Sequence, residues 1–245
     1  MSIPFALQLY TVRVPLAQDT ANTMRRVKEA GYTYVELAGL SGKTPMEFKT
    51  MLDDAGLLPV SSHFGMEEYS ERMDSVLERC SLFGVKHAIL SYANAEDRAG
   101  WEKTAAQLNQ IAEQLGEAGV SFLYHNHAHE FEKQYDGLYA LDILLGGAPK
   151  VMVQLDTFWV RYGKEDPVAY IRKYTGRCPL LHVKDMAPEG DKPIFAEVGS
   201  GTLEWPDIFA AAQQAGVAWY IVEQDECKGD PIESAAVSAK FLAGQ

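Results

Sequence analysis

The sequence predicts a single-domain (β/α)8 barrel over residues 1–245, and three observations carry this prediction. Short apolar runs rich in Val, Ile, Tyr and Phe alternate with longer segments of helical spacing. Glycines recur at the expected helix ends, directly before the next apolar run. The length of 245 residues is common for one barrel of this kind. The runner-up is an open doubly wound sheet, but neither a dinucleotide-binding glycine loop nor a P-loop follows the first apolar run.

Each apolar run is short enough to be a strand. We expect eight strands, at residues 5–10, 34–37, 59–63, 87–92, 120–125, 151–156, 180–184 and 219–224. The segments between them carry apolar stripes at i, i+3, i+4 and i+7, for example from Met73 to Phe83 and from Leu108 to Leu115. Thr44, Pro45 and Glu47 form a capping box, and the Asp-Pro pairs at 166–167 and 230–231 mark two further helix starts.

The longest irregular stretch is residues 187–202, which contains two prolines and three glycines. It follows the seventh expected strand, on the face where barrels of this kind place their active sites. We therefore expect a lid or a substrate loop here, with a merely tolerated insertion as the alternative.

Composition excludes several classes of protein. The net charge of −12 and the pI near 4.9 argue against nonspecific binding to nucleic acid or anionic lipid, because both need clustered Lys and Arg. No apolar run approaches the roughly 20 residues of a membrane span, and the first ten residues do not look like a signal peptide. Cys80, Cys178 and Cys227 lie far apart and are expected to be free thiols. These features predict a cytoplasmic protein, and they leave a homo-oligomer open.

Polar, ionisable residues end five of the expected strands, which is where barrel enzymes hold their catalytic groups. The most conspicuous run is residues 122–131, which holds three of the six histidines, and Glu130 directly follows the last of them. The strand-end residues are His63, His125, His127, Asp156, His182, Lys184, Asp185 and Glu223. Five strands that end in this way indicate convergence on one point.

Strand alternation sorts these side chains, because residues two apart share a face. His182 and Lys184 are therefore expected to point together, as are His125 and His127, and Gln8 and Tyr10. Asp156, His182 and Glu223 fit the last inward positions of their strands. One imidazole and two carboxylates can bind a divalent cation, and Glu130 is the natural fourth ligand. That oxygen-rich set favours Mn²⁺ or Mg²⁺, with Zn²⁺, Co²⁺ or Fe²⁺ as further candidates.

Each of these residues also has a structural alternative. Asp156 is placed to cap the following helix, His182 to be a hydrogen-bonded core histidine, and Glu223 to pair with Lys184. Glu36 on the second strand is either an inward carboxylate that supports the site or a buried partner of Arg13.

The order of these residues along the chain resembles the xylose isomerase-like TIM barrels, a superfamily with sugar phosphate isomerases and epimerases, inosose dehydratase and endonuclease IV. The matching pieces are QLYTVR at 8–13, GYTYVEL at 31–37, SH at 62–63, YHNHAHEF at 124–131, LD at 155–156, HVKD at 182–185, VGSG at 198–201 and Glu223. The resemblance implies one divalent metal held by Glu, Asp, His and Glu from strands five to eight. Asp156, His182 and Glu223 match these positions.

Two departures from the family pattern matter. The epimerases carry the first Glu within strand five, whereas here Glu130 lies beyond it, so His125 or His127 is the alternative ligand. Trp159 stands three residues after Asp156, where the epimerases and endonuclease IV tend to have His. This argues against a close ketose 3-epimerase, and more strongly against endonuclease IV.

The resemblance implies chemistry on a carbohydrate-like carbonyl compound, in which an α-proton leaves and the cation stabilises an enediolate. Glu130 and Glu223 are the expected bases, with His125 and His127 as the alternatives. Lys184 is expected either to polarise the carbonyl or to anchor an acidic group. We expect substrate contacts from Gln8, Tyr10, His63, Trp159 and Asp185. Three functions remain: an isomerase or epimerase, a dehydratase, hydratase or lyase on a keto-polyol or 3-keto-glycoside, and a non-catalytic sugar-binding barrel.

Overall fold

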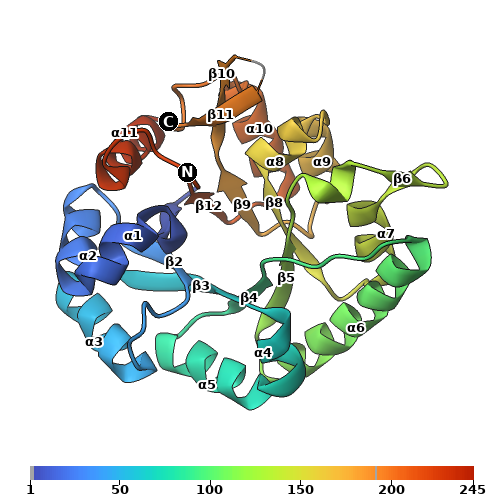
Figure 1. Ribbon diagram of the computed structural model, residues 1–245, viewed down its shortest axis with the longest axis horizontal. Helices are drawn as coiled ribbons and strands as arrows, with labels where there is room; N and C mark the ends of the chain where they lie inside the picture. Colours follow the sequence, from blue (N-terminus) through green and yellow to red (C-terminus); the bar gives the residue numbers. More distant parts are fainter. Residues whose placement is uncertain (1–2, 191) are drawn as a thin grey trace.

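The computed structural model describes residues 3–190 and 192–245, and within them eight parallel strands close into one barrel surrounded by helices (Figure 1). Met1, Ser2 and Asp191 lie outside the described residues, and Asp191 belongs to the loop expected at residues 187–202. The barrel strands are β1 (Phe5–Gln8), β2 (Tyr34–Ala38), β3 (Leu58–Phe64), β4 (His87–Leu90), β5 (Ser121–His125), β8 (Met152–Asp156), β9 (Leu180–Val183) and β12 (Trp219–Val222). All eight predicted strands, and with them the predicted fold class, are confirmed.

Helices follow the barrel strands and cover the outside of the barrel. They are α1 (Arg13–Gln18), α2 (Thr20–Glu29), α3 (Pro45–Ala55), α4 (Met66–Glu71), α5 (Met73–Phe83), α6 (Arg98–Glu117), α7 (Ala140–Gly147), α8 (Thr157–Tyr162), α9 (Pro167–Lys173), α10 (Trp205–Ala215) and α11 (Pro231–Ala243), with 3-10 turns η1 (Leu9–Val12) and η2 (His129–Phe131). The predicted capping box at Thr44 is present, and Asp166 and Asp230 cap α9 and α11.

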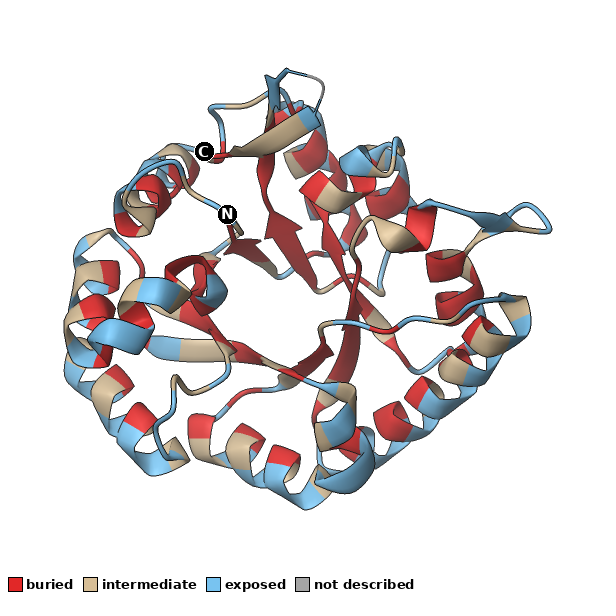
Figure 2. Cartoon of the chain, viewed as in Figure 1, coloured by how far each residue is buried: buried red, intermediate tan, exposed pale blue. Residues whose placement is uncertain are grey.

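The hydrophobic core is divided by the barrel wall. The larger part lies between the strands and the inner faces of the helices, which Figure 2 shows as buried stripes on otherwise exposed helices. A smaller cluster fills the barrel itself and consists of Ala6, Ile89, Leu123, Leu180 and Ile221. These five side chains close the interior, so the barrel is a packed core and not a pore.

A polar layer lies directly above this apolar cluster. Strand alternation explains it, because the residue two positions after an inward-facing residue also faces inward. The inward series from Leu123 leads to His125, that from Leu180 leads to His182, and that from Ile221 leads to Glu223. In the parallel register, Asp156 pairs with His182, which brings these strand ends to one level. The fold thus gathers ionisable groups at the carboxyl end of the barrel.

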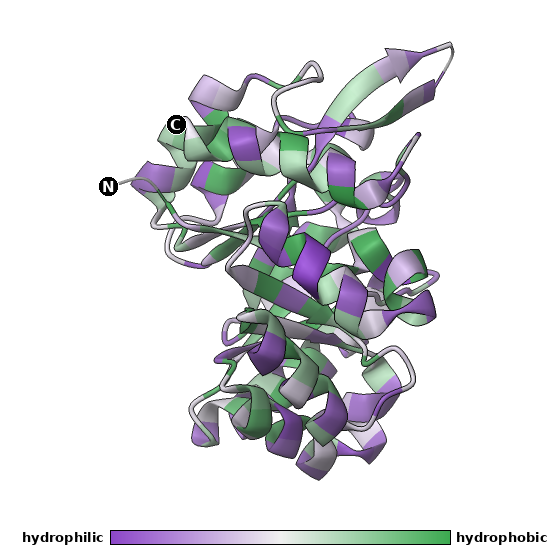
Figure 3. Ribbon diagram, turned by 90° about the vertical axis from the view of Figure 1, so that its left-hand side faces the viewer, coloured by the Kyte–Doolittle hydropathy of each residue, from purple (hydrophilic) through white to green (hydrophobic). Residues whose placement is uncertain are grey.

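The loop expected at residues 187–202 is more regular than the sequence predicted. Its first part belongs to an antiparallel hairpin of β10 (Asp185–Glu189) and β11 (Lys192–Ala196). The hairpin lies at the top of Figure 1 and projects beyond the rest of the chain in the turned view of Figure 3. A second short hairpin, β6 (Gln134–Tyr135) with β7 (Leu138–Tyr139), lies outside the barrel.

In the described residues no helix is both long and apolar enough to span a membrane. Cys80 and Cys178 are buried and Cys227 is partly buried, and all three are free thiols, as the sequence predicted.

Candidate active site

The base of the site is organised around the buried carboxylate of Glu36 on β2. Its polar partners come from β1, β3, β8 and β9 and are Gln8, Ser61, His63, Gln154 and His182. The Glu36 Oε1 atom lies 2.6 Å from His182 Nε2 and 2.9 Å from His63 Nε2. Burial alone would raise the pKa of Glu36, but the two histidines outweigh it and hold that pKa well below its usual value.

Glu36 therefore has the supporting role that the sequence left open. The alternative partner, Arg13, contacts Tyr10 instead: its guanidinium lies 4.1 Å from the ring centroid and donates to the Tyr10 carbonyl at 3.0 Å. The charge of Glu36 is thus directed at the imidazoles beneath the cavity.

His182 links the base of the site to the strand-end carboxylates. Its Nε2 faces Glu36, and its Nδ1 lies 3.0 Å from Glu223 Oε2. Burial favours the neutral ring, but Glu36 and Glu223 outweigh it and raise the pKa of His182 to about 9. A carboxylate behind one ring nitrogen fixes the tautomer and directs the other nitrogen into the site.

The two carboxylate oxygens of Asp156 differ in their surroundings. Its Oδ1 accepts a hydrogen bond from Trp159 N at 3.0 Å and caps α8. Its Oδ2 is buried and accepts no hydrogen bond from the described residues, although Lys184 Nζ lies 3.0 Å away. Burial raises the pKa of Asp156. A buried carboxylate oxygen that accepts no hydrogen bond from the protein is costly, which indicates that it is suited to a ligand.

Lys184 places a positive charge against three carboxylates. Its Nζ lies 3.0 Å from Asp156 Oδ2, 2.5 Å from Glu223 Oε2 and 3.0 Å from Asp225 Oδ1, and only the last contact has hydrogen-bond geometry. Burial would lower its pKa, but the carboxylates outweigh it and raise the pKa of Lys184, which keeps the ammonium charged. Burial and Glu223 raise the pKa of Asp225 to about 6.

His125 completes a compact group with Asp156, His182 and Glu223. One ligand atom from each of the four residues lies within 4.8 Å of those of the others. The His125 Nε2 atom lies 4.0 Å from Asp156 Oδ2, and its buried Nδ1 has no partner among the described residues. Burial and the neighbouring His182 hold the pKa of His125 well below its usual value, so the ring is neutral and able to bind a metal.

Glu130, the fourth ligand predicted from the sequence, does not belong to this group, and His125, one of its predicted alternatives, takes that place. The turn η2 directs its carboxylate back onto β5, where Oε1 accepts from the Tyr124 hydroxyl at 2.6 Å and Oε2 from His127 N at 2.9 Å. The neighbouring residues with which Glu130 could hold a metal ion are His127 and His129, not Asp156. Both oxygens of Glu130 are thus occupied by protein donors, and the side chain stabilises the turn after β5.

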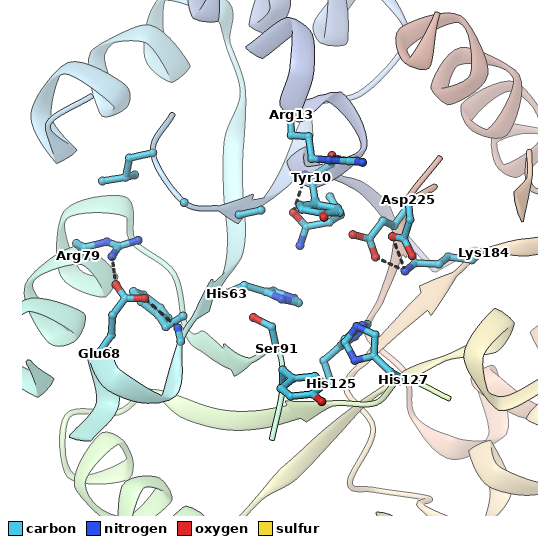
Figure 4. Close-up of a pocket in the computed structure, with 18 of the residues that line it drawn as sticks. Tyr10, Arg13, His63, Glu68, Arg79, Ser91, His125, His127, Lys184 and Asp225 are labelled. Atoms are coloured by element: carbon cyan, nitrogen blue, oxygen red, sulfur yellow. Dashed lines mark hydrogen bonds and ion pairs between the residues drawn. The ribbon is translucent and has the colours of Figure 1, made fainter. Parts of the chain in front are cut away.

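A cavity of about 780 Å³ opens above these groups (Figure 4). Among the residues predicted to act in catalysis or to contact substrate, Gln8, Tyr10, His63, His125, His127, Lys184 and Glu223 line it. Glu130 is not among the lining residues. In Figure 4, His125 and His127 lie beside Lys184 and Asp225, with His63 nearer the centre.

Trp159 and Asp185, which were expected to contact substrate, do not line this cavity. The Trp159 ring packs against His127 at 5.7 Å and against Phe195 of the hairpin at 5.6 Å between ring centroids. It therefore supports His127 from behind. Burial and Lys184 lower the pKa of His127 to about 3, which leaves its imidazole neutral.

Asp185 is a structural residue at the start of the hairpin. Its carboxylate accepts hydrogen bonds from Met186 N, Gly199 N, Gly201 N, Leu203 N and Trp205 Nε1. The close approach explains Gly201, since a Cβ at this position would collide with the Asp185 carboxylate. Asp185 thus ties the segment after β11 to the end of the barrel.

Replacement of Asp185 by Ala is expected to destabilise the protein by at least about 3 kcal/mol, because several buried N–H groups lose their acceptor. Urea denaturation measures this loss. Asp54→Ala, at an exposed position of α3, is the matched control and is expected to change stability by less than about 0.5 kcal/mol. Equal losses in the two variants would contradict the structural role of Asp185.

Sequence reasoning did not single out three residues that the geometry brings to the site: Gln154, Asp225 and Tyr92. The Gln154 Oε1 atom lies 2.9 Å from His63 Nε2, and Gln154 Nε2 donates a hydrogen bond to Glu36. Its inward direction could have been predicted, because Gln154 stands two residues before Asp156 on the same strand. Asp225 stands two residues after Glu223 and lines the cavity with Tyr92. No sequence signal separates Tyr92 from an ordinary strand-end aromatic.

Comparison with known proteins agrees with this architecture. The family model for xylose isomerase-like TIM barrels matches residues 24–244. The crystal structure of a sugar phosphate isomerase/epimerase from Parabacteroides distasonis is 30% identical, with a TM-score of 0.80, and the match covers 98% of this chain and 93% of that one.

Curated relatives are more distant. An inosose dehydratase from Lacticaseibacillus casei is 28% identical over 163 residues, which are 58% of this chain and 53% of that protein. This chain thus spans about half the length of that curated relative. The rhizopine catabolism protein MocC of Rhizobium meliloti is 24% identical, over 90% of this chain and 79% of its own. Together with the barrel topology and the family match over most of its length, these likenesses show that the chain belongs to the xylose isomerase-like TIM barrel family, whose relatives include sugar-processing enzymes.

Proposed function

We propose that this protein is an enzyme that removes a proton from the carbon next to the carbonyl of a keto-sugar or keto-polyol, with the help of one divalent cation. The observation that carries the proposal is the buried group of His125, Asp156, His182 and Glu223 at the base of the cavity. Buried strand-end carboxylates and imidazoles that meet at one point suit cation binding better than they suit a hydrophobic ligand.

The donor set alters the expected identity of the metal. With His125 in place of Glu130 the ligands are two imidazole nitrogens and two carboxylates, not one imidazole and three carboxylates. Imidazole-rich sites favour Zn²⁺, Co²⁺ or Fe²⁺, with Mn²⁺ next and Mg²⁺ least. When bound, the cation would polarise the substrate carbonyl and stabilise the negative charge that develops as the proton leaves.

The chain's own residues provide the remaining chemistry. The Lys184 ammonium, held by Asp225, donates a hydrogen bond toward the carbonyl oxygen of the substrate. Glu223 and His127 line the cavity and are the bases within reach of a bound sugar, since Glu130 faces away from it. Gln8 and His63 provide polar groups that orient hydroxyl groups of the substrate.

Lys184 and a divalent cation compete for the same oxygens, Asp156 Oδ2 and Glu223 Oε2. We therefore expect Lys184→Met to bind Zn²⁺ or Mn²⁺ at least about tenfold more tightly, because a like charge is removed from the site. The variant is expected to lose activity at the same time. Lys184→Arg keeps the charge and is the control in calorimetric titration. An unchanged or weaker metal affinity of Lys184→Met would contradict the shared cation position.

Proton removal leads to two outcomes. Return of the proton gives an isomerase or epimerase, which is the reaction named for the Parabacteroides distasonis relative. Loss of a group from the next carbon gives a dehydratase or lyase, which is the activity named for the Lacticaseibacillus casei relative. The elimination remains a full second candidate because His127, at the cavity wall, can pass on to the leaving group the proton that it has taken up as the base.

The test is proton exchange in D₂O, followed by NMR, with a panel of ketoses, inososes and 3-keto-glycosides in the presence of Zn²⁺ or Mn²⁺. Incorporation of deuterium next to the carbonyl supports the proposal. Return of exchanged substrate or an epimer identifies the first reaction, and release of water or an aglycone identifies the second. Binding of these compounds without exchange or elimination would instead support a non-catalytic sugar-binding barrel.

A further inference from the structure

The cavity has two chemically different parts. The inner part, at the carboxyl ends of β5, β9 and β12, carries the ionisable groups described above. The outer part extends over the ends of β1 to β4 and is lined by Tyr10, Leu40, Phe64 and Tyr92, among others. In Figure 4 the Glu68–Arg79 ion pair lies on the opposite side of the cavity from Lys184 and Asp225, with His63 between them. The inner part alone accounts for proton transfer, so the outer part needs a separate explanation.

The volume of the cavity exceeds the need of a single sugar ring. At about 780 Å³ it lies in the upper part of the range of roughly 300–1,000 Å³ that is typical of sites for drug-sized ligands. A free ketose or inosose bound to Lys184 and Glu223 leaves the outer part to solvent.

Two tyrosine rings in the outer part are held in place by protein on one side. Tyr10 is 42% exposed, and Arg13 lies over its ring at 4.1 Å. Tyr92 is 52% exposed, and its ring packs on His129 with 4.7 Å between the centroids. A large exposed ring that packs against protein on one face is already held in position. It can therefore stack on a flat ligand at little cost in conformational entropy.

The charges of the cavity are largely compensated. Arg79, in the outer part, is paired with Glu68 at 2.6 Å, and Lys184, in the inner part, is held by three carboxylates. A phosphate would meet the guanidinium of Arg13 in a cavity that also presents Asp225 and Glu226. The lining thus favours an uncharged ring over an anionic group.

On the basis of the proposed function, we propose that the outer part is a subsite for a second ring. The substrate is then a keto-sugar in which the carbon beyond the α-carbon carries a ring-shaped group through an oxygen atom. In that substrate the base takes the α-proton, the electron pair forms the carbon–carbon double bond, the bond to the ring-bearing oxygen breaks, and that oxygen takes up a proton. The products are an unsaturated ketone and an alcohol, with no net oxidation.

Binding of unreactive sugars tests the subsite separately from the chemistry. The probes are glucose, phenyl β-glucoside and cellobiose, titrated calorimetrically into the wild type, Tyr92→Ala, Tyr92→Phe and Tyr135→Ala. We expect phenyl glucoside or cellobiose to bind more tightly than glucose, by about 2- to 12-fold for each stacking ring. Tyr92→Ala removes this advantage, Tyr92→Phe retains it, and glucose affinity stays unchanged. A gain for phenyl glucoside alone identifies an aromatic second ring, and a gain for cellobiose identifies a sugar.

Tyr135→Ala, a tyrosine of β6 that does not line the cavity, controls for a general effect of tyrosine loss. Equal affinity for glucose and both two-ring probes, undetectable binding of all three, or equal effects of Tyr92→Ala and Tyr135→Ala would overturn the subsite. Tighter binding of glucose 6-phosphate that is lost in Arg13→Ala would overturn it in favour of a phosphate site. Failure of deuterium exchange with intact two-ring binding would reject the proposed reaction and not the subsite.

Discussion

Glu223→Gln is expected to lower kcat/KM at least about 1,000-fold, the upper end of the effect of removing one group that stabilises developing charge. The carboxylate faces both His182 Nδ1 and Lys184 Nζ, and it is one of the four proposed cation ligands. The neutral amide keeps the shape of the side chain but removes its charge and its capacity as a base. Steady-state kinetics on the substrate found by deuterium exchange, together with metal titration, measures both effects.

Glu226→Gln is the matched control for this variant. Glu226 lines the same cavity, yet no hydrogen bond or ion pair of the described residues joins its carboxylate to His182 or Lys184. Its loss is expected to change kcat/KM less than tenfold. Comparable losses for the two variants would show that general cavity charge, and not the specific position of Glu223, drives the reaction.

Glu36→Gln is expected to weaken divalent metal binding by about 10- to 100-fold without removing a ligand, because Glu36 orients His182 from behind. It is also expected to destabilise the metal-free protein by about 3–5 kcal/mol, since it breaks a fully buried ion pair. Metal titration and urea denaturation check the two effects. Glu47→Gln, at an exposed position of α3, is the control and is expected to leave metal affinity unchanged.

The stability effect of Glu36→Gln has a defined pH dependence in the metal-free protein. The pKa of His182 rises from 6.5 to about 9, so its stabilising contribution is complete below pH 6.5 and is lost as the pH rises through about 9. The lowered pKa of Glu36 makes its contribution complete above its ordinary value of 4.5, and that contribution is lost as the pH falls below it. The difference from wild type is therefore largest between about pH 5 and 6.5. A difference that stays constant up to pH 9 would contradict the ion pair.

Much of the fold and part of the site could be predicted because barrel geometry is periodic. Apolar runs separated by capped helices specify the strands, and alternation within each strand specifies which side chains share a face. The common direction of His182 and Lys184 follows from this rule, and both reach Glu223 Oε2. Asp156 needed more than periodicity, because one oxygen caps a helix and the other faces the site.

The structure departs from the expected arrangement where the chain leaves the regular strands. Glu130 was expected at the metal because it follows the histidine run, but the 3-10 turn after β5 directs it to the Tyr124 hydroxyl. Asp185 directly follows strand β9 and begins a hairpin, and its carboxylate accepts from backbone amides of the segment after β11. Turn geometry of this kind depends on backbone angles that residue spacing does not specify.

The proposed cation site is tested most directly by the anomalous diffraction of crystals soaked in Zn²⁺ or Mn²⁺. We expect one strong peak with His125, Asp156, His182 and Glu223 ligand atoms at about 2.0–2.3 Å. We also expect the Lys184 ammonium to leave Asp156 and Glu223 and to keep its contact with Asp225. A peak at His127, His129 and Glu130 instead, or saturating metal with Lys184 still between Asp156 and Glu223, would contradict the proposed site.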